Sequence, residues 1–559
     1  MDLFWRVEKL LKLISSVEQK KIEIFLRKIL DALRIKHFVY RMLIVPNQKI
    51  ALRRLRKIIN NSPAIENKYS GKKVLFNSVD GRYMQTTYIE GAIAKSLQMR
   101  GHKVKMLICG GALNMCTTFH RIDHPPNRWS CKNCISFSKK FYETTGLPYS
   151  TYDEYLKHKK GLTSIKNKVE EMPIEECEKL IYKGVKVGNH AKTSAKRYFR
   201  GGEPPEDKFE LILRYELMNA IISTDTAEEL LKKEKPDVLV TTHGCYSSWG
   251  SITDYFRNQG IRVCVWGGGY KDDIRFDRYK WNFKKYYEEV RKKRLLDEEE
   301  KKDLACFLDK REEGSEGQIA LYNYSDTDKE QLEKQFNFNK YDKTYVMFPN
   351  VPWDAALLSA DVAFKNVYDW ISNTIEFFED KPKLQLIIKI HPSEIRVMES
   401  KRTLLDYINS KFPSLPENIK TIPPDTKISP YSLFPFIDVG IIYNGTAGLE
   451  MSIQGIPVIV AGAALYRNKG FTYDINKKEE YSEVLSKDIS TLPNQQNLAK
   501  LYAYFYFIKS FVPHDFIYYN SFLDMGWNIN SLEEFNPGNN KHLDRICDYI
   551  INDGIFQYW

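Results

Sequence analysis

The chain has 559 residues, 43% hydrophobic and 28% charged, a composition typical of folded domains that excludes wholesale disorder. Its longest apolar run, residues 456–465, is far shorter than the ~20 residues of a membrane-spanning helix, which argues against a spanning protein. The first residues carry charges throughout and lack an apolar core, so we expect no secretory signal. With nine cysteines and no such signal, the reducing cytoplasm is the expected location.

The net charge of +12 is concentrated at the start of the chain. Residues 1–60 hold 15 Lys and Arg against 5 Asp and Glu, whereas the other 499 residues are almost neutral. Residues 1–65 have helical periodicity, Pro46 is expected to end the first helical stretch, and a short basic helix is expected over residues 50–59. Two interpretations stay open: amphipathic helices on an anionic membrane at the inner face of the cell membrane, or a hairpin packed on the main domain. Confinement of the basic residues to this segment disfavours nucleic-acid binding.

Strands and helices alternate over residues 70–290. A strand at 73–77, a helix at 86–100 stopped by Gly101 and a strand at 104–109 form one strand–helix–strand unit. A second unit has a strand at 236–241, a helix at 250–258 and a strand at 261–266. Such units are typical of a parallel sheet, so this segment is predicted to be an N-terminal Rossmann-like domain on the acceptor side of the protein.

The same alternation returns over residues 341–490, after a charged segment at 290–340 that we interpret as a linker or insertion. Strands are expected at 345–349, 384–390, 439–443 and 458–461, with helices at 362–378 and 447–454. Residues 491–559 are rich in aromatic residues and are expected to form helices that pack across both domains. The predicted fold class is therefore α/β, with two doubly wound Rossmann-like domains facing a cleft.

A glycine-rich turn follows the expected strand at 439–443. Asn444, Gly445 and Thr446 precede a helix, an arrangement in which free backbone N–H groups and a hydroxyl can bind an anion. Glu450 lies one turn into that helix, where its carboxylate can accept hydrogen bonds from a ribose diol. The alternative is an ordinary strand-to-helix turn in which the glycines serve only the geometry.

Other polar residues end neighbouring strands of the same domain. His391 follows the strand at 384–390, and ligands of open α/β sheets bind at the carboxyl ends of their strands. Its imidazole can donate to a phosphate oxygen, and Lys389 can add charge there. An Asn-Pro-type loop beginning at Asn350 precedes both features, so three candidate binding segments occur in order. A His-Pro pair that merely starts a turn is the alternative for His391.

This ordered set, FPNVPWD, KIHPSE and NGTAGLEMSIQGIPVIVAG, resembles capsule polysaccharide biosynthesis proteins and related bacterial surface-glycan transferases, including the Kdo-transferase and polysialyltransferase types with a His-Pro motif. The resemblance covers mainly residues 340–465. It implies a two-domain GT-B glycosyltransferase whose C-terminal half holds a nucleotide sugar, with His391 and Thr446 on the donor phosphate and Glu450 on the nucleoside. The chain lacks the paired glutamates, eight residues apart, of one retaining subgroup, because Ile442 and Val458 occupy those positions.

A catalytic base is expected from the N-terminal domain. The candidates are Asp80, His243 and the pair Asp272 and Asp273, all at expected strand ends. A base needs hydrogen-bond reach to the acceptor hydroxyl and a pKa near the working pH, which a histidine meets without tuning. Each candidate has a helix cap or loop cap as its alternative role. No convincing Asp-x-Asp pair is present, so no catalytic metal is expected.

Four cysteines cluster within 26 residues of the N-terminal domain. Cys109, Cys116, Cys131 and Cys134 include one Cys-x-x-Cys pair, which we expect on a tight loop, and four thiolates suit a structural zinc ion. Small buried residues with no metal are the alternative.

Together these features predict a cytoplasmic glycosyltransferase that needs no cofactor for catalysis. Its partners would be a nucleotide-sugar donor and a surface-glycan or lipid-linked acceptor, with the basic segment holding it near a membrane. Two rivals stay open: a nucleotide-sugar epimerase on the same paired-domain scaffold, and a non-catalytic scaffold of a glycan-assembly complex.

Overall fold

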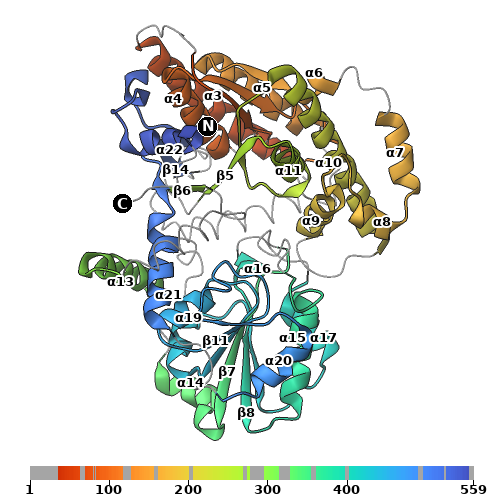
Figure 1. Ribbon diagram of the computed structural model, residues 1–559, viewed down its shortest axis with the longest axis vertical. Coiled ribbons are helices and arrows are strands. Elements are labelled where there is room, and N and C mark those ends of the chain that lie inside the picture. The colour runs from red at the N-terminus through yellow and green to blue at the C-terminus, as the bar shows by residue number, and fades with distance from the viewer. Residues whose placement is uncertain are drawn as a thin grey trace.

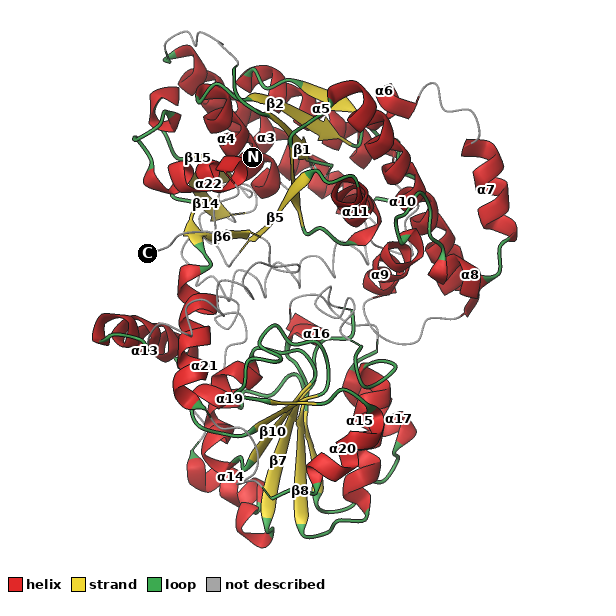
Figure 2. Ribbon diagram, in the orientation of Figure 1, coloured by secondary structure: helices red, strands yellow, loops and turns green. Residues whose placement is uncertain are grey.

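The computed structural model arranges the chain as two α/β domains that lie one above the other along the longest axis (Figure 1). The following residues are described: 36–62, 70–79, 81, 84–116, 128–156, 162–199, 206–268, 273–276, 295–313, 328–353, 361–396, 402–488, 495–521 and 524–552. Figure 2 shows that each domain has a central sheet with helices around it. The expectation of an α/β fold with two Rossmann-like domains is confirmed.

The first domain is built on a seven-stranded sheet in the order β13-β6-β5-β4-β1-β2-β3. Strands β1 to β5 are parallel, and β6 and β13 extend the sheet through antiparallel pairs. The strands are β1 Lys73–Asn77, β2 Lys103–Ile108, β3 Tyr149–Thr151, β4 Val238–Thr242, β5 Arg262–Gly268, β6 Asp273–Phe276 and β13 Val512–Pro513. A separate hairpin pairs β14 Ile517–Ser521 with β15 Asp524–Trp527.

Helices of the first domain form two layers, whose buried side chains make one core on each face of the sheet. They are α3 Lys36–Asn60, α4 Met84–Met99, α5 Arg128–Thr145, α6 Tyr152–Leu156, α7 Leu162–Glu171, α8 Ile174–Lys179, α9 Val187–Phe199, α10 Glu206–Glu234, the π-helical turn η2 Tyr246–Gly250, α11 Ser251–Asn258, η9 Leu532–Phe535 and α22 Lys541–Asn552. The sequence prediction missed most of the second layer, α6 to α10.

The second domain has a six-stranded parallel sheet in the order β12-β11-β10-β7-β8-β9. If the six strands are numbered 1 to 6 along the chain, beginning with β7, their order across the sheet from β9 to β12 is 3-2-1-4-5-6. This is the doubly wound arrangement of dinucleotide-binding folds. The strands are β7 Lys343–Phe348, β8 Leu384–Lys389, β9 Ile419–Ile422, β10 Val439–Ile442, β11 Val458–Val460 and β12 Tyr473–Asp474. Strands β7, β8, β10 and β11 were predicted to within a few residues.

Helices cover both faces of this sheet (Figure 2). On one side lie α14, α19 and α21, and on the other α15, α17 and α20. The helices are α13 Glu298–Glu312, α14 Lys329–Phe336, η4 Phe338–Lys340, α15 Val367–Glu379, α16 Ser393–Arg396, α17 Leu404–Lys411, α18 Pro430–Leu433, η6 Phe434–Phe436, α19 Ala447–Ile453, α20 Lys478–Leu485, α21 Gln496–Ala503 and the π-helical turn η8 Tyr504–Lys509.

The described parts of the charged segment interpreted as a linker or insertion, residues 295–313 and 328–340, pack into the second domain. Leu304 of α13, and Leu332 and Phe336 of α14, are buried in the same core as β7 and β10. Helix α14 is capped by the Asp328 side chain, which accepts from the N–H of Glu330 at 3.2 Å. The few apolar side chains at helical spacing therefore hold these helices against the core of the second domain, although charged residues outnumber them.

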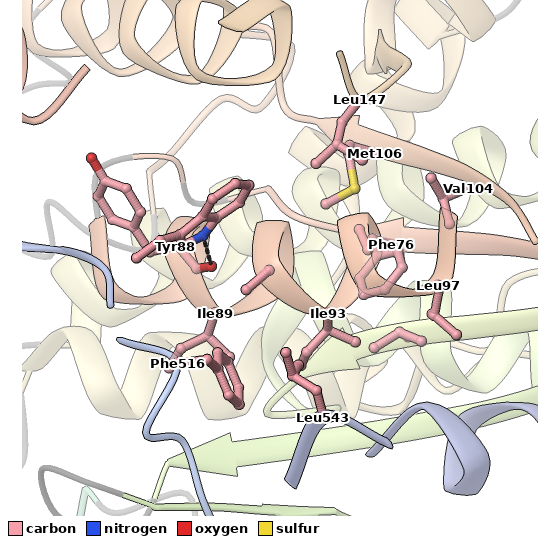
Figure 3. Close-up of a cluster of buried hydrophobic side chains, with 14 of the residues drawn as sticks. Phe76, Tyr88, Ile89, Ile93, Leu97, Val104, Met106, Leu147, Phe516 and Leu543 are labelled. Atoms are coloured by element: carbon pink, nitrogen blue, oxygen red, sulfur yellow. Dashed lines mark hydrogen bonds between the residues drawn. The ribbon is translucent and has the colours of Figure 1, made fainter. Parts of the chain in front are cut away.

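The end of the chain returns to the first domain. Helix α21 packs on α19 of the second domain, and after η8 the strand β13 pairs with β6 of the first sheet. Figure 3 shows Phe516 and Leu543 below α4, packed beside Ile89 and Ile93. The Trp527 indole also donates to the Tyr88 carbonyl at 2.9 Å. The last described residues thus complete the first domain's core, partly through strands rather than through the helices alone that were expected.

Helix α3 runs through Pro46, contrary to the prediction that this residue ends it. The proline removes only one backbone donor, and packing of α3 against α5 and β15 holds the helix across that position. Ala51, Leu52 and Leu55 are buried in the core of the first domain, whereas Arg53, Arg56 and Lys57 are exposed. At these positions α3 packs on the first domain, as the packed interpretation expects. The face formed by Ala51, Leu52 and Leu55 is therefore not available for insertion into a bilayer. Residues 1–35, which complete the predicted basic segment, lie outside the described part.

Among the described residues, no helix combines the length and apolar character needed to cross a membrane.

Candidate functional site

Three polar residues line up across neighbouring strands of the second sheet. Ile442 of β10 pairs with Phe348 of β7, and Met347 of β7 pairs with Ile388 of β8. Extending both registers past the last paired residues orders Asn444, Asn350 and His391 as one row along this edge of the sheet. This row lies where the strand order reverses between β7 and β10, the position at which doubly wound sheets bind ligands.

The loop after β10 is braced from two sides. The Asn350 side chain accepts from the Asn444 N–H at 2.9 Å, which joins two of the row's residues directly. Tyr466 donates to the Gly445 carbonyl at 2.6 Å. A Cβ at Gly448 would come within 2.2 Å of the Tyr466 hydroxyl, so only glycine allows α19 this close. Asn350, Gly445 and Thr446 remain partly exposed and open to a ligand.

His391 is held in one tautomer by its own loop. The Ser393 N–H donates to Nδ1 at 3.1 Å, so Nδ1 carries a lone pair and the proton of the neutral ring lies on Nε2. A neutral His391 is therefore a hydrogen-bond donor at Nε2, as contact with a phosphate oxygen requires. By contrast, Lys389 ends β8 and is only 3% exposed, which leaves little surface for a bound ligand.

Glu450 is engaged inside the protein. It is 6% exposed, its Oε1 accepts from Arg311 Nη2 at 2.9 Å, and its Oε2 accepts from the Tyr431 hydroxyl. The carboxylate expected to bind a ribose diol thus already has a partner on each oxygen. A nucleoside contact by Glu450 stays a prediction, and it would have to use the remaining lone pairs.

A buried carboxyl group follows the His-Pro pair. Glu394 on α16 is fully buried and accepts from the Leu404 N–H at 2.8 Å, which ties α16 to the start of α17. Burial raises the pKa of Glu394 to about 8. The group therefore holds its proton at neutral pH, directly beside the segment that carries His391.

The first sheet reverses its strand order between β1 and β4. Asn77 of β1 pairs with Thr241 of β4, so the same register places His243 opposite Val79. His243 is exposed at this edge, which suits a residue that must reach an acceptor hydroxyl. Asp80 and Asp272 lie outside the described residues, as does the side chain of Asp273, so among the base candidates only His243 is described.

The turn that presents His243 adopts an unusual backbone. His243 and Tyr246 have φ of 57° and 66°, in the left-handed region that non-glycine residues rarely occupy. The His243 ring packs against Trp249 and Tyr246, with ring centroids 5.3 and 6.1 Å away. Arg197 donates to the Tyr246 hydroxyl at 2.6 Å and lies over its ring. Backbone strain held by packing is common at functional sites, which is consistent with a role for this turn.

The ligand edge of the second sheet faces the first domain. In Figure 1, α16, which follows β8, lies at the end of the second domain nearest the first. Lys196 of α9 is close enough to Asp361 for their charges to interact. Asp361 in turn accepts from the hydroxyl of Tyr443, the residue before Asn444, at 2.6 Å. Helix α9 of the first domain is therefore near the row of Asn444, Asn350 and His391.

The cysteines are arranged differently from the expectation. Cys131 and Cys134 lie within helix α5 rather than on a tight loop, one turn apart, because the apolar spacing of residues 128–145 favours a helix. Cys109 directly follows β2. Burial is the main cause that raises the pKa of the Cys109 thiol, and the nearby Cys131 adds a smaller contribution. Among the described residues, no three His, Cys, Asp or Glu side chains form a group that could hold a metal ion. The four-thiolate set with Cys116 is thus not assembled there.

Sequence reasoning missed four residues of this site. Arg311 lies in a run of charged residues, and nothing in the sequence separates it from its neighbours. Tyr431 and Tyr466 belong to segments without a motif. Glu394 stands inside the quoted KIHPSE segment, and a carboxyl group so close to a buried strand was a usable signal.

Residues 301–506 match the family model described as capsule polysaccharide biosynthesis protein. The predicted resemblance to this family is therefore confirmed for that part of the chain, which contains most of α13, the whole second sheet and α21. A search of the curated proteins gives no match.

Several solved structures are similar in fold. The β-Kdo 2,4-transferase KpsC of Thermosulfurimonas dismutans shares 14% identity, covering 54% of this chain and 88% of its own, with a TM-score of 0.34. UDP-GlcNAc 2-epimerase from Neisseria meningitidis, bound to UDP-GlcNAc, shares 10% identity over 78% of this chain and 98% of its own, with a TM-score of 0.25. The glycotransferase of kitacinnamycin shares 12% identity over 78% of this chain and 93% of its own, with a TM-score of 0.23. At such values these matches do not discriminate between activities.

Proposed function

We propose that the protein is a glycosyltransferase of capsule or surface-glycan synthesis, taking the family match over residues 301–506 as the premise. The observation that carries the proposal is the row of Asn444, Asn350 and His391 at the strand-order reversal of the second sheet. The donor would be a nucleotide sugar, and the acceptor a glycan or lipid-linked glycan.

In the proposed reaction, the second domain holds the donor and the first supplies the acceptor. His391 donates from Nε2 to a donor phosphate, and Thr446 with the backbone of Gly445 adds further donors. As the glycosidic bond to phosphate breaks, negative charge grows on the leaving phosphate, and these preorganised donors stabilise it. A base of the first domain, with His243 as the described candidate, accepts the proton of the attacking acceptor hydroxyl.

The donor assignment is tested by His391→Ala. Loss of the Nε2 donor should weaken binding of CMP, UDP or GDP by roughly tenfold, the value of one hydrogen bond to a charged group. Isothermal titration of the full chain measures this affinity. His542→Ala is the control, because His542 lies on α22 of the first domain. Unchanged affinity of the His391 variant for every nucleotide that the wild type binds would contradict the phosphate role.

An epimerase uses the same kind of paired-domain scaffold and is the second candidate. It converts a nucleotide sugar without an acceptor, whereas a transferase needs one. Incubation with nucleotide sugars alone, followed by nuclear magnetic resonance of the sugar ring, separates the two. Epimer formation would overturn the transferase proposal, and absence of all nucleotide binding in a thermal-shift screen would favour a non-catalytic scaffold.

A further inference from the structure

Arg311 connects α13 to the helix that begins the donor segment. Its side chain is 15% exposed and that of Glu450 is 6% exposed, so the pair is shielded from water. One guanidinium nitrogen donates to Glu450 at 2.9 Å, and Tyr431 completes the carboxylate's partners. Glu450 lies in the first turn of α19, four residues after Thr446, so Arg311 sets the position of that turn.

The same guanidinium packs against a pair of stacked aromatic rings. It lies over the ring of Phe507 at 5.1 Å and over that of Phe307 at 5.7 Å, and the two rings stack with centroids 5.1 Å apart. Phe507 belongs to η8, the π-helical turn through which the chain leaves the second domain before β13 joins the first sheet. Figure 1 shows α13 beside α21, next to this crossing.

An ion pair with a purely structural role is the simpler interpretation, but the surroundings of Arg311 favour a second role in connecting two parts of the protein. Buried ion pairs add little net stability, because desolvation offsets much of the attraction. Arg311 Nε is also buried without a hydrogen-bond partner among the described residues, which makes the arrangement costly as a stabilising device. What it does provide is one rigid group that contacts both the donor segment and the interdomain crossing.

We infer that Arg311 is a positioning residue that couples the donor segment, residues 444–450, to the crossing at Tyr504–Lys509, so that nucleotide binding and the arrangement of the two domains are linked. This inference rests on the proposed function, because it takes residues 444–450 as part of the donor site. Arg311 acts through Glu450 and Phe507, without contact to the substrate.

The first test changes the crossing rather than the site. Phe507→Leu removes the ring over Arg311 and should lower nucleotide affinity about tenfold, the usual scale of coupling between contacting residues. The matched control is Phe378→Leu, an equally conservative change in the core on the other face of the sheet. It should lower the thermal midpoint without changing affinity. Wild-type affinity in Phe507→Leu, with a thermal loss equal to the control's, would overturn the coupling.

The second test needs no ligand, so it also applies if the wild type binds no nucleotide and the proposed function fails. In hydrogen–deuterium exchange of the full chain, Arg311→Met should speed exchange in both Ala447–Ile453 and Tyr504–Lys509. Arg214→Met is the control, because Arg214 is similarly shielded, at 16% exposed, and pairs with Glu210 in the first domain. Faster exchange in only one of the two segments, or equal changes in the control, would overturn the inference.

Discussion

At the scale of single residues, the second domain keeps ionisable groups beside its ligand row for different purposes. His391 has its tautomer fixed by the Ser393 N–H. Glu450 is paired with Arg311. Glu394 is protonated at neutral pH because burial outweighs the hydrogen bond from Leu404. The three groups lie within 60 residues of one another in the chain, and their environments decide their roles.

The raised pKa of Glu394 predicts how stability depends on pH. Between the ordinary pKa of 4.5 and about 8, the folded protein holds a proton that the unfolded chain has released. The free energy of unfolding should therefore fall as pH rises through this window, by at most about 1.4 kcal/mol per unit. Below pH 4.5 this contribution is fully present.

Glu394→Gln should remove that dependence and make the protein more stable than wild type at pH 8.5. Urea unfolding at pH 5.5, 7.0 and 8.5 measures it. Glu379→Gln, at an exposed position on α15, is the matched control and should keep the wild-type slope. If the free energy of unfolding of the Glu394 variant depends on pH as steeply as that of the wild type, the proton is not held by the Glu394 carboxyl group.

At the scale of elements, periodicity predicted the strands well and the roles of the helices less well. Strand β1 was predicted residue for residue, because a short apolar run ending at a turn leaves little choice. Helix α3 ran through a proline, and α5 absorbed the Cys-x-x-Cys pair, since tertiary packing overrode the local signals. Short strands such as β3 and β12 have no pattern of their own and depend on a neighbouring strand.

Zinc binding by Cys109, Cys116, Cys131 and Cys134 stays a prediction, although among the described residues these four thiols are not gathered into a metal site. Cys131 and Cys134 lie one turn apart on α5, and Cys131 lies near Cys109. The expected result is about one zinc per chain in protein purified under reducing, chelator-free conditions, and a lower content in the variant Cys131→Ser with Cys134→Ser. Elemental analysis decides it. A metal-free wild type would refute zinc binding. The variant Cys177→Ser, at a buried cysteine elsewhere, is the control.

At the scale of the whole molecule, the two sheets repeat one design. In each, the strand order reverses beside the first strand, and Asn350, Asn444 and His243 follow strands that flank those two reversals. The sequence allowed this prediction because polar residues directly follow buried strands. The partners of Glu450 could not be predicted in this way, because Arg311 and Tyr431 lie 139 and 19 residues away from it in the chain and are brought to it only by folding.

Membrane association also belongs to this scale, and with Ala51, Leu52 and Leu55 of α3 buried, binding through this part of the helix would be electrostatic. Reversing three exposed charges in Arg53→Glu, Arg56→Glu and Lys57→Glu should lower binding to phosphatidylglycerol vesicles about a hundredfold, at about 1 kcal/mol per cation. Co-sedimentation at low salt measures it. The same reversal at the exposed residues Lys166, Lys168 and Lys179 is the control. Equal binding of both variants and wild type would refute a membrane role for α3.

The return of the chain to the first domain affects how the protein is made on the ribosome. Strand β1 and helix α4 emerge early, but their core needs Phe516, Trp527 and Leu543, which are translated after the entire second domain. At 5–20 residues per second, the early half waits roughly 10–50 s with apolar surface uncovered. The second domain, continuous in the chain, is free to fold first. We therefore expect the second domain to complete its fold before the first, although it is translated later.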